Sequence, residues 1–270
     1  MNLYTEQAGN LTRHRADDLR RLRAFRLLDD DFMSKVFEDK SCVEFLLQII
    51  LNRKDLKVQS INSQYSLKNL QGRSICLDIL ALDNKNCIYN IEIQRNDYGA
   101  NPKRARYNSS LLDANITQPG DTYQQLRETY VIFITENDFF NLGLPIYHID
   151  RMVTETNTTF EDGAHIIYVN AQIKNNTALG KLMHDFSCTD ANEMHYKILA
   201  DRVHFFKEDS KGVTAMCKAM EDMRNEAVHE HAIESAKAMI ASGKLTQEEI
   251  AIFSGLTLEE IKSLIPKYPA

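Results

Sequence analysis

The sequence predicts an α/β (α+β) fold in which a sheet-containing core precedes a helical C-terminal region. Two kinds of strand signal support the core: apolar and polar residues that alternate, and a continuous β-branched and aromatic run, TYVIFIT. Strand signals stop near residue 176, and only helical patterns follow. We therefore divide the chain into an N-terminal helical arm (1–28), a core (29–176) and a helical C-terminal region (177–270).

Composition limits the kind of protein that this chain can be. With 270 residues and 43% hydrophobic content, it can form one large domain with an appendage. A net charge of -6 gives no global basic field, so a polyanionic partner must meet a local basic patch. Five scattered cysteines without a CxxC argue against a disulfide framework and against a zinc site. Lacking an 18-residue apolar run and a signal-peptide h-region, the chain is expected to be cytoplasmic with no membrane partner.

The first elements follow from periodicity. The arm alternates arginines with acids, so we expect a solvated helix there. Apolar residues at helical spacing predict one helix or a broken pair over residues 31–51, and imperfect alternation predicts a strand over 57–67. Two apolar strands separated by the polar turn DNKN predict a β-hairpin over 74–82 and 87–94.

The remaining elements are read in the same way. Pro102 near a first turn predicts a helix over 101–115, and TYVIFIT predicts a buried strand over 129–135. Two further strands are expected at 145–153 and 164–173. Helices are expected at 177–187, 190–208, 211–241, 246–252 and 257–265.

The hairpin carries two carboxylates that need an explanation. Glu92 and Gln94 share one face of their strand, and Asp78 lies on the partner strand. A turn centred on Asn84 and Lys85 places position 78 opposite 91, and a slip of one residue would send Asp78 to the other face.

Two carboxylates that lie close together where water is partly excluded repel each other unless a cation lies between them. Oxygen donors favour Mg²⁺ or Mn²⁺, an ion that can activate water and offset charge on a phosphoryl oxygen. Gln94 could orient that water or touch the phosphate. The alternative is a wet face whose acids only meet solvent.

The segments LDILALD, NIEIQRND, KRARYNSSLLDANI and GDTYQQLRETYVIFITEND resemble the PD-(D/E)XK nuclease superfamily, and more closely the Rpn family of recombination-promoting nucleases and transposases. The resemblance covers roughly residues 30–170 and extends loosely to the C-terminus. It implies a restriction-endonuclease-like core, with a mixed central sheet flanked by helices. It also implies a metal-dependent DNA endonuclease that hydrolyses phosphodiester bonds in recombination or transposition.

By resemblance, Asp78 and Glu92 are metal ligands, the carbonyl of Ile93 is a third ligand, and Gln94 takes the place of the superfamily's catalytic lysine. Glutamine carries no positive charge, and no proline precedes Asp78, so the chain departs from the superfamily pattern at two points. Members often add an acid from the first helix. Our candidate is Glu44, with Glu38 as the rival.

A basic segment follows the hairpin. Arg95, Lys103, Arg104 and Arg106 stand against a single acid, Asp97, and forked arginine donors suit phosphate. We expect DNA-backbone contacts here, with Tyr107 stacking on a base or packing. The alternative is an ordinary charged helix face.

The C-terminal segment GKLTQEEIAIFSGLTLEEIKSL contains two capping boxes, Thr246 with Glu249 and Thr257 with Glu260, around a turn at Gly255. The pattern is typical of a helix-turn-helix-like pair. Its second helix starts with acids, which suits a major groove poorly, so we favour packing or homo-oligomerisation.

Two other function classes stay open. The missing lysine is consistent with a DNA-binding or assembly protein that keeps the nuclease fold with little or no catalysis. The helical C-terminal half is consistent with a structural interaction module. The histidines lie apart in sequence and support no triad, and no P-loop, Gly-x-Ser-x-Gly or dinucleotide fingerprint occurs.

Overall fold

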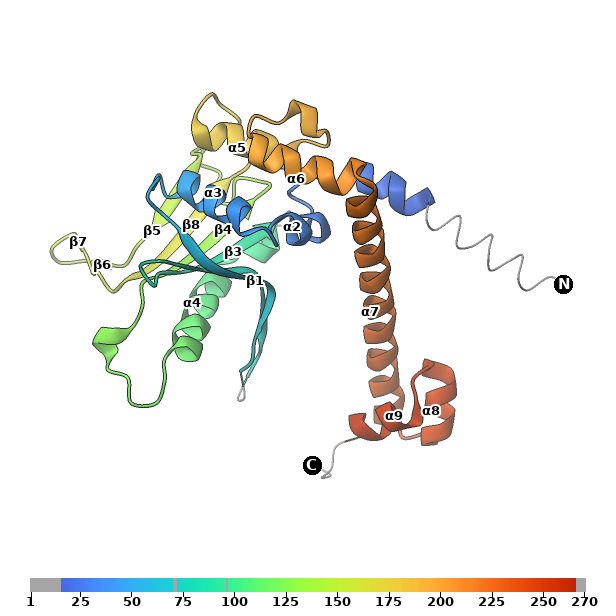
Figure 1. Ribbon diagram of the computed structural model, residues 1–270. Helices are drawn as coiled ribbons and strands as arrows, with labels where there is room; N and C mark the ends of the chain where they lie inside the picture. The colour runs from blue at the N-terminus through green and yellow to red at the C-terminus, as the bar shows by residue number, and fades with distance from the viewer. Residues whose placement is uncertain (1–15, 70–71, 96, 266–270) are drawn as a thin grey trace. The chain divides into compact units, whose positions relative to one another are not determined.

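The structure is a computed structural model that describes residues 16–69, 72–95 and 97–265. It contains a six-stranded mixed sheet in the order β1-β2-β3-β4-β8-β5, together with a two-stranded sheet of β6 and β7. Strands β3, β4 and β8 run parallel, and the other neighbours pair antiparallel. The predicted fold class is thereby confirmed (Figure 1).

The strands lie close to their predicted positions. Their bounds are β1 Val58–Leu67, β2 Ile75–Asp83, β3 Ile88–Gln94, β4 Thr129–Thr135, β5 Ile146–Ile149, β6 Met152–Val153, β7 Thr158–Thr159 and β8 Ala164–Asn170. The predicted strand over 145–153 is divided between β5 and β6, which belong to different sheets.

The helices also follow the periodicity. Their bounds are α2 Asp30–Val36, α3 Lys40–Ile50, α4 Pro102–Ile116, α5 Ala178–Ser187, α6 Lys197–Glu208, α7 Ser210–Ser242, α8 Gln247–Ser254 and α9 Leu258–Leu264, with 3-10 turns η1 Asp97–Ala100, η2 Tyr123–Gln125 and η3 Ala191–Glu193. The pattern over 31–51 is the broken pair, because the Asp39 side chain accepts from Ser41 N–H and starts α3. Among the helices within the described ranges, none has the length and apolar content needed to cross a membrane.

Helices cover both faces of the large sheet, with α4 on one side and α2, α3 and α5 on the other (Figure 1). On the α4 side, Leu112, Val131, Phe133 and Tyr168 belong to one buried apolar cluster. The phenol of Tyr168 donates to the carbonyl of Ala100 at 2.8 Å and so fixes the segment before α4 to the sheet. This packing sets the position of α4 over the carboxyl end of β3.

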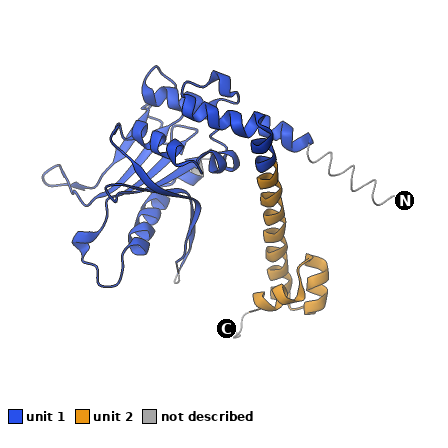
Figure 2. Ribbon diagram, viewed as in Figure 1, with its two compact units in different colours: residues 1–216 blue, residues 217–270 orange. Residues whose placement is uncertain are grey.

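The chain divides into two compact units, residues 1–216 and 217–270, which Figure 2 colours separately. The boundary between these units differs from the predicted one at 176/177, because α5 and α6 belong to the unit that contains the sheet. The N-terminal segment also differs from a wholly solvated arm. Residues 1–15 lie outside the described residues, a helix covers 16–24, and Leu22, Leu27 and Leu28 are buried.

In the second unit, both predicted capping boxes are present, at Thr246 with Glu249 and at Thr257 with Glu260. Gly255 adopts a φ of 75° at the end of α8, a left-handed conformation that suits glycine. Ile250, Leu256 and Ile261 pack with Ala236 of α7 in a small apolar core. The described contacts of this pair thus include apolar packing and the approach of His229 Nε2 of α7 to Glu260 Oε1 at 3.4 Å.

The hairpin register differs from the predicted one by a single residue. The last paired residues are Ile79 and Ile91, so continuing the ladder places Asp78 opposite Glu92, not opposite Ile91. The cause is the turn, where Asp83 N–H bonds the carbonyl of Cys87 and Asn86 takes a φ of 65°. Three residues thus form the turn, one more than the two-residue turn assumed from sequence.

Candidate metal centre and nucleic-acid interface

The site lies where β2 and β3 separate. Because residues directly opposite each other in an antiparallel pair share a face, Asp78 and Glu92 lie on the same side of the sheet. In place of a ladder bond, the N–H of Ile93 donates to Asp78 Oδ2 at 3.0 Å. The C=O and N–H of one strand residue point the same way, so the Ile93 carbonyl also faces β2. The two carboxylates therefore lie on one face of the sheet, next to the strand gap that the Ile93 carbonyl faces.

Glu92 has no exposed surface, and both of its oxygens accept hydrogen bonds. Asn90 Nδ2 donates to Oε1 at 2.9 Å, and Arg104 Nη2 donates to Oε2. Arg104 reaches from the first turns of α4, where Asn101 caps the helix and Pro102 occupies its first turn. A buried carboxylate needs such partners, and α4 supplies the cationic one.

Electrostatics at the pair disfavour two negative charges. Burial, reinforced by the charge of Glu92, raises the pKa of Asp78 to about 7. Burial also raises the pKa of Glu92, although the hydrogen bond from Asn90 and the charge of Arg104 oppose the rise. A pair of carboxyl groups in this state gains most from a cation that lies between them.

Asp30, at the start of α2, is an acid that sequence reasoning missed. Its negative charge adds to the rise in pKa of both Asp78 and Glu92, so it lies within electrostatic reach of the pair. The predicted first-helix acid, Glu44, is elsewhere, because it accepts from Lys57 Nζ at 2.7 Å and from Val58 N–H at 3.0 Å. Its rival Glu38 pairs with Lys35. The run of three acids at 29–31 resembles an ordinary helix start, so the sequence does not mark Asp30 as a neighbour of the pair.

Gln94 lies against the 3-10 turn η1. A Cβ built on Gly99 would fall 1.6 Å from Gln94 Oε1, so any side chain at position 99 would force this amide to move. The carbonyl of the same Gly99 accepts from Arg104 Nη1 at 3.1 Å. Gln94 therefore shares its surroundings with the arginine that bonds Glu92.

The predicted DNA-contacting residues have different surroundings. Arg95 pairs with Asp29 at 2.8 Å and with Glu136 at 3.3 Å, which ties it to other protein groups. The hydroxyl of Tyr107 donates to the carbonyl of Arg73, so this tyrosine holds a loop. Lys103 and Arg106 are exposed near the start of α4.

A groove of about 790 Å³ runs beside the acids. Its walls include Gly99 and four cationic side chains, those of Arg73, Lys103, Arg104 and Arg106, and no acid is among its described lining residues. Arg104 belongs both to this groove and to the pair with Glu92. The local basic patch that an acidic chain needs for a polyanion is therefore present next to the carboxylates.

Asn90 and Asn108 connect the acids to α4. Asn108 Nδ2 donates to Asn90 Oδ1 at 3.2 Å, and Asn90 in turn donates to Glu92. Both asparagines are buried. Asn90 follows the alternation that places Glu92 on this face, and that spacing was the signal in the sequence that could have identified it.

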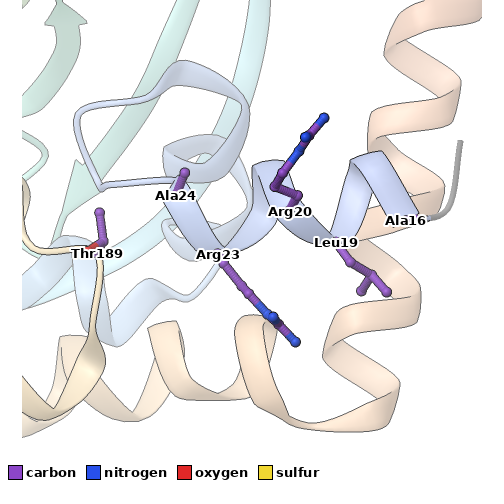
Figure 3. Close-up of a pocket in the computed structure, with 6 residues that line it drawn as sticks. All are labelled: Ala16, Leu19, Arg20, Arg23, Ala24 and Thr189. Carbon is purple, nitrogen blue, oxygen red and sulfur yellow. The ribbon is translucent and has the colours of Figure 1, made fainter. Parts of the chain in front are cut away.

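A second cavity, of about 720 Å³, lies between the helix over 16–24 and Thr189 (Figure 3). Arg20 and Arg23 line it together with Leu19 and two alanines. The charged groups in its described lining are the guanidinium groups of Arg20 and Arg23.

Comparison with protein families gives one result. The model of a family described as "PD-(D/E)XK nuclease family transposase" matches residues 31–254, a range that includes the hairpin, α4 and most of the C-terminal helices. No curated protein and no solved structure matches the chain.

Proposed function

The chain belongs to the PD-(D/E)XK nuclease family of transposases, and we propose that it is a metal-dependent DNA endonuclease acting in recombination or transposition. The observation that carries the proposal is the placement of Asp78 opposite Glu92, with the pKa of both carboxyl groups raised. Such a pair is typical of a site that awaits a cation.

The donor set fits Mg²⁺ or Mn²⁺, which prefer oxygen ligands. The carboxylates of Asp78 and Glu92 and the carbonyl of Ile93 would hold the ion, and the negative charge of Asp30 would add to its attraction. When bound, a divalent ion lowers the pKa of water and offsets charge on a phosphoryl oxygen. Gln94, on the same face as Glu92, would orient the water by hydrogen bonding.

Arg104 is suited to a phosphate at this place. It pairs with Glu92 and also lines the basic groove. Its guanidinium would therefore contact Glu92 and a phosphate in the groove at the same time. Arg73, Lys103 and Arg106 would contact neighbouring phosphates along the strand. Arg95 and Tyr107, which are engaged with other protein groups, would support the site and not touch DNA.

The test is cleavage of supercoiled plasmid by the wild type, Asp78→Ala and Glu92→Ala proteins with Mg²⁺, Mn²⁺, Ca²⁺ or EDTA. We expect nicking by the wild type with Mg²⁺ or Mn²⁺, and at least a ~100-fold loss in each variant, because loss of an outer-sphere partner alone costs about 10–100-fold. Cleavage by Asp78→Ala at the wild-type rate would refute the proposal.

A second candidate function is DNA binding with little or no catalysis. It is favoured by Gln94, which stands where a nuclease lysine would be, and by Glu92, whose oxygens are both bonded already. A gel shift that survives EDTA, combined with no cleavage under Mn²⁺, would select this alternative.

A further inference from the structure

The end of α5 brings together three side chains of metal-binding type, far in sequence from the carboxylate pair. They are His184, Asp185 and Cys188, whose candidate ligand atoms all lie within 4.8 Å of one another. His184 and Cys188 are four residues apart and so lie on one face of the helix end. Asp185 is fully buried, and Cys188 is nearly so.

A second imidazole lies against this group. The ring of His195 has its centroid 4.6 Å from that of His184. The backbone holds it there, because His195 N–H donates to Asp185 Oδ1 at 2.7 Å and Tyr196 N–H donates to Oδ2 at 2.8 Å. His195 is exposed, so its ring has room to rotate toward the group.

Two of the three distances within the group suit a tetrahedral ion, and the third is below 4.8 Å. Bonds of about 2.3 Å to sulfur and about 2.0 Å to nitrogen or oxygen place S and N about 3.5 Å apart, and O and N about 3.3 Å apart. Cys188 Sγ lies 3.5 Å from His184 Nδ1, and Asp185 Oδ1 lies 3.4 Å from the same nitrogen. Each oxygen of Asp185 keeps a lone pair after accepting its backbone N–H.

We propose that His184, Asp185 and Cys188 form a zinc site that His195 completes. A thiolate, imidazoles and a carboxylate are the ligands that zinc takes in proteins. Binding forms a Zn–S bond, breaks the S–H bond of Cys188 and releases one proton to solvent. The ion would join the end of α5 to the segment before α6, two parts of one compact unit.

The sequence does not suggest this site, because the cysteines form no CxxC and the histidines lie apart along the chain. The fold supplies the missing proximity, since the chain between Cys188 and Lys197 turns through η3 and returns His195 to His184. The proposal does not depend on nuclease activity.

Titration with Co²⁺, followed by displacement with Zn²⁺, tests the site in the full-length chain. The titration uses the Asp78→Ala protein as the parent. This variant lacks a ligand of the proposed nuclease centre, so Co²⁺ bound at that centre should not contribute to the signal. We expect one Co²⁺ per chain, with a sulfur-to-cobalt charge-transfer band that Cys188→Ser abolishes. Loss of the exposed imidazole in His195→Ala should weaken binding by about 10–100-fold without unfolding the chain.

Matched controls are Cys217→Ser, which removes another thiol, and His148→Ala, which removes another exposed imidazole. Both should leave the spectrum and the affinity unchanged. The proposal is overturned if the Asp78→Ala protein binds no Co²⁺, or if the charge-transfer band survives Cys188→Ser. Equal affinity in His195→Ala and its parent would remove His195 from the ligand set.

Discussion

Strand β2 carries a carboxylate near each end, and the surroundings of the two differ. Asp83 has no exposed surface and accepts from Lys85 N–H, Cys87 N–H and the Tyr89 hydroxyl at 2.8–2.9 Å, with Arg53 at 3.9 Å.

Asp78 accepts from one backbone N–H and faces a second acid, and its pKa rises to about 7. Asp83 is fully buried and Asp78 is partly buried, and a second difference separates the two acids. The distinction lies in whether the protein itself supplies enough donors and positive charge.

The largest expected effect tests this difference directly. Asp83→Ala leaves Tyr89 and two backbone donors without their acceptor, so we expect the free energy of unfolding to fall by about 3–5 kcal/mol. Asp78→Asn, the matched change on the same strand, should leave that free energy unchanged or raise it at pH 8. Urea unfolding in EDTA measures both, and equal losses would remove the distinction.

The second-largest expected effect is the contribution of Asp78 to the pH dependence of stability. Asp78 binds its proton more tightly in the folded chain than in the unfolded one, where an Asp pKa is about 3.9. Its protonation therefore stabilises the metal-free fold fully below about pH 4, and this stabilisation is lost as the pH rises through about 7. The loss is at most about 4 kcal/mol, because one pKa unit is worth about 1.4 kcal/mol.

This contribution is obtained as the difference in urea unfolding between the wild type and Asp78→Asn across pH 4–8 in chelator. Taking a difference cancels the other titrating groups. A difference that stays constant across the range would contradict the raised pKa of Asp78.

A smaller effect is expected at Gly99. Its replacement by alanine would displace the Gln94 amide from the proposed site. We therefore expect cleavage to slow by about 10–100-fold, which is the usual cost of losing a group that positions a metal site. The control is Gln94→Ala, in which the clash is absent. Adding Gly99→Ala to that variant should cost little more, and an additive loss would show that Gly99 acts independently of Gln94.

The smallest effect concerns the groove. Arg106→Ala would remove one of the proposed phosphate contacts, so the slope of log affinity for DNA against log salt should fall by about 1. Lys197→Ala, which removes a cation paired with Asp201 outside the groove, should leave the slope unchanged. Fluorescence anisotropy with labelled duplex at several salt concentrations measures both variants.

Local pattern explains which parts of the fold and site were predictable. TYVIFIT became β4, as its continuous apolar character indicated, and alternation correctly placed Glu92 and Gln94 on one face. Glu44 contacts Lys57 and Val58, which the sequence could not predict, because helical periodicity does not say which end of a helix meets the sheet. The His184–His195 contact depends on the path of η3, for which the sequence carries no periodic signal.

The turn at residues 84–86 has a consequence for how the site can be lost. An insertion or deletion in an exposed loop is usually harmless to a fold. Here, shortening the loop by one residue would rotate every side chain of one strand relative to its neighbour, and Asp78 would turn away from Glu92. Natural length variation at this surface point would therefore separate homologues able to hold an ion from homologues that keep only the scaffold.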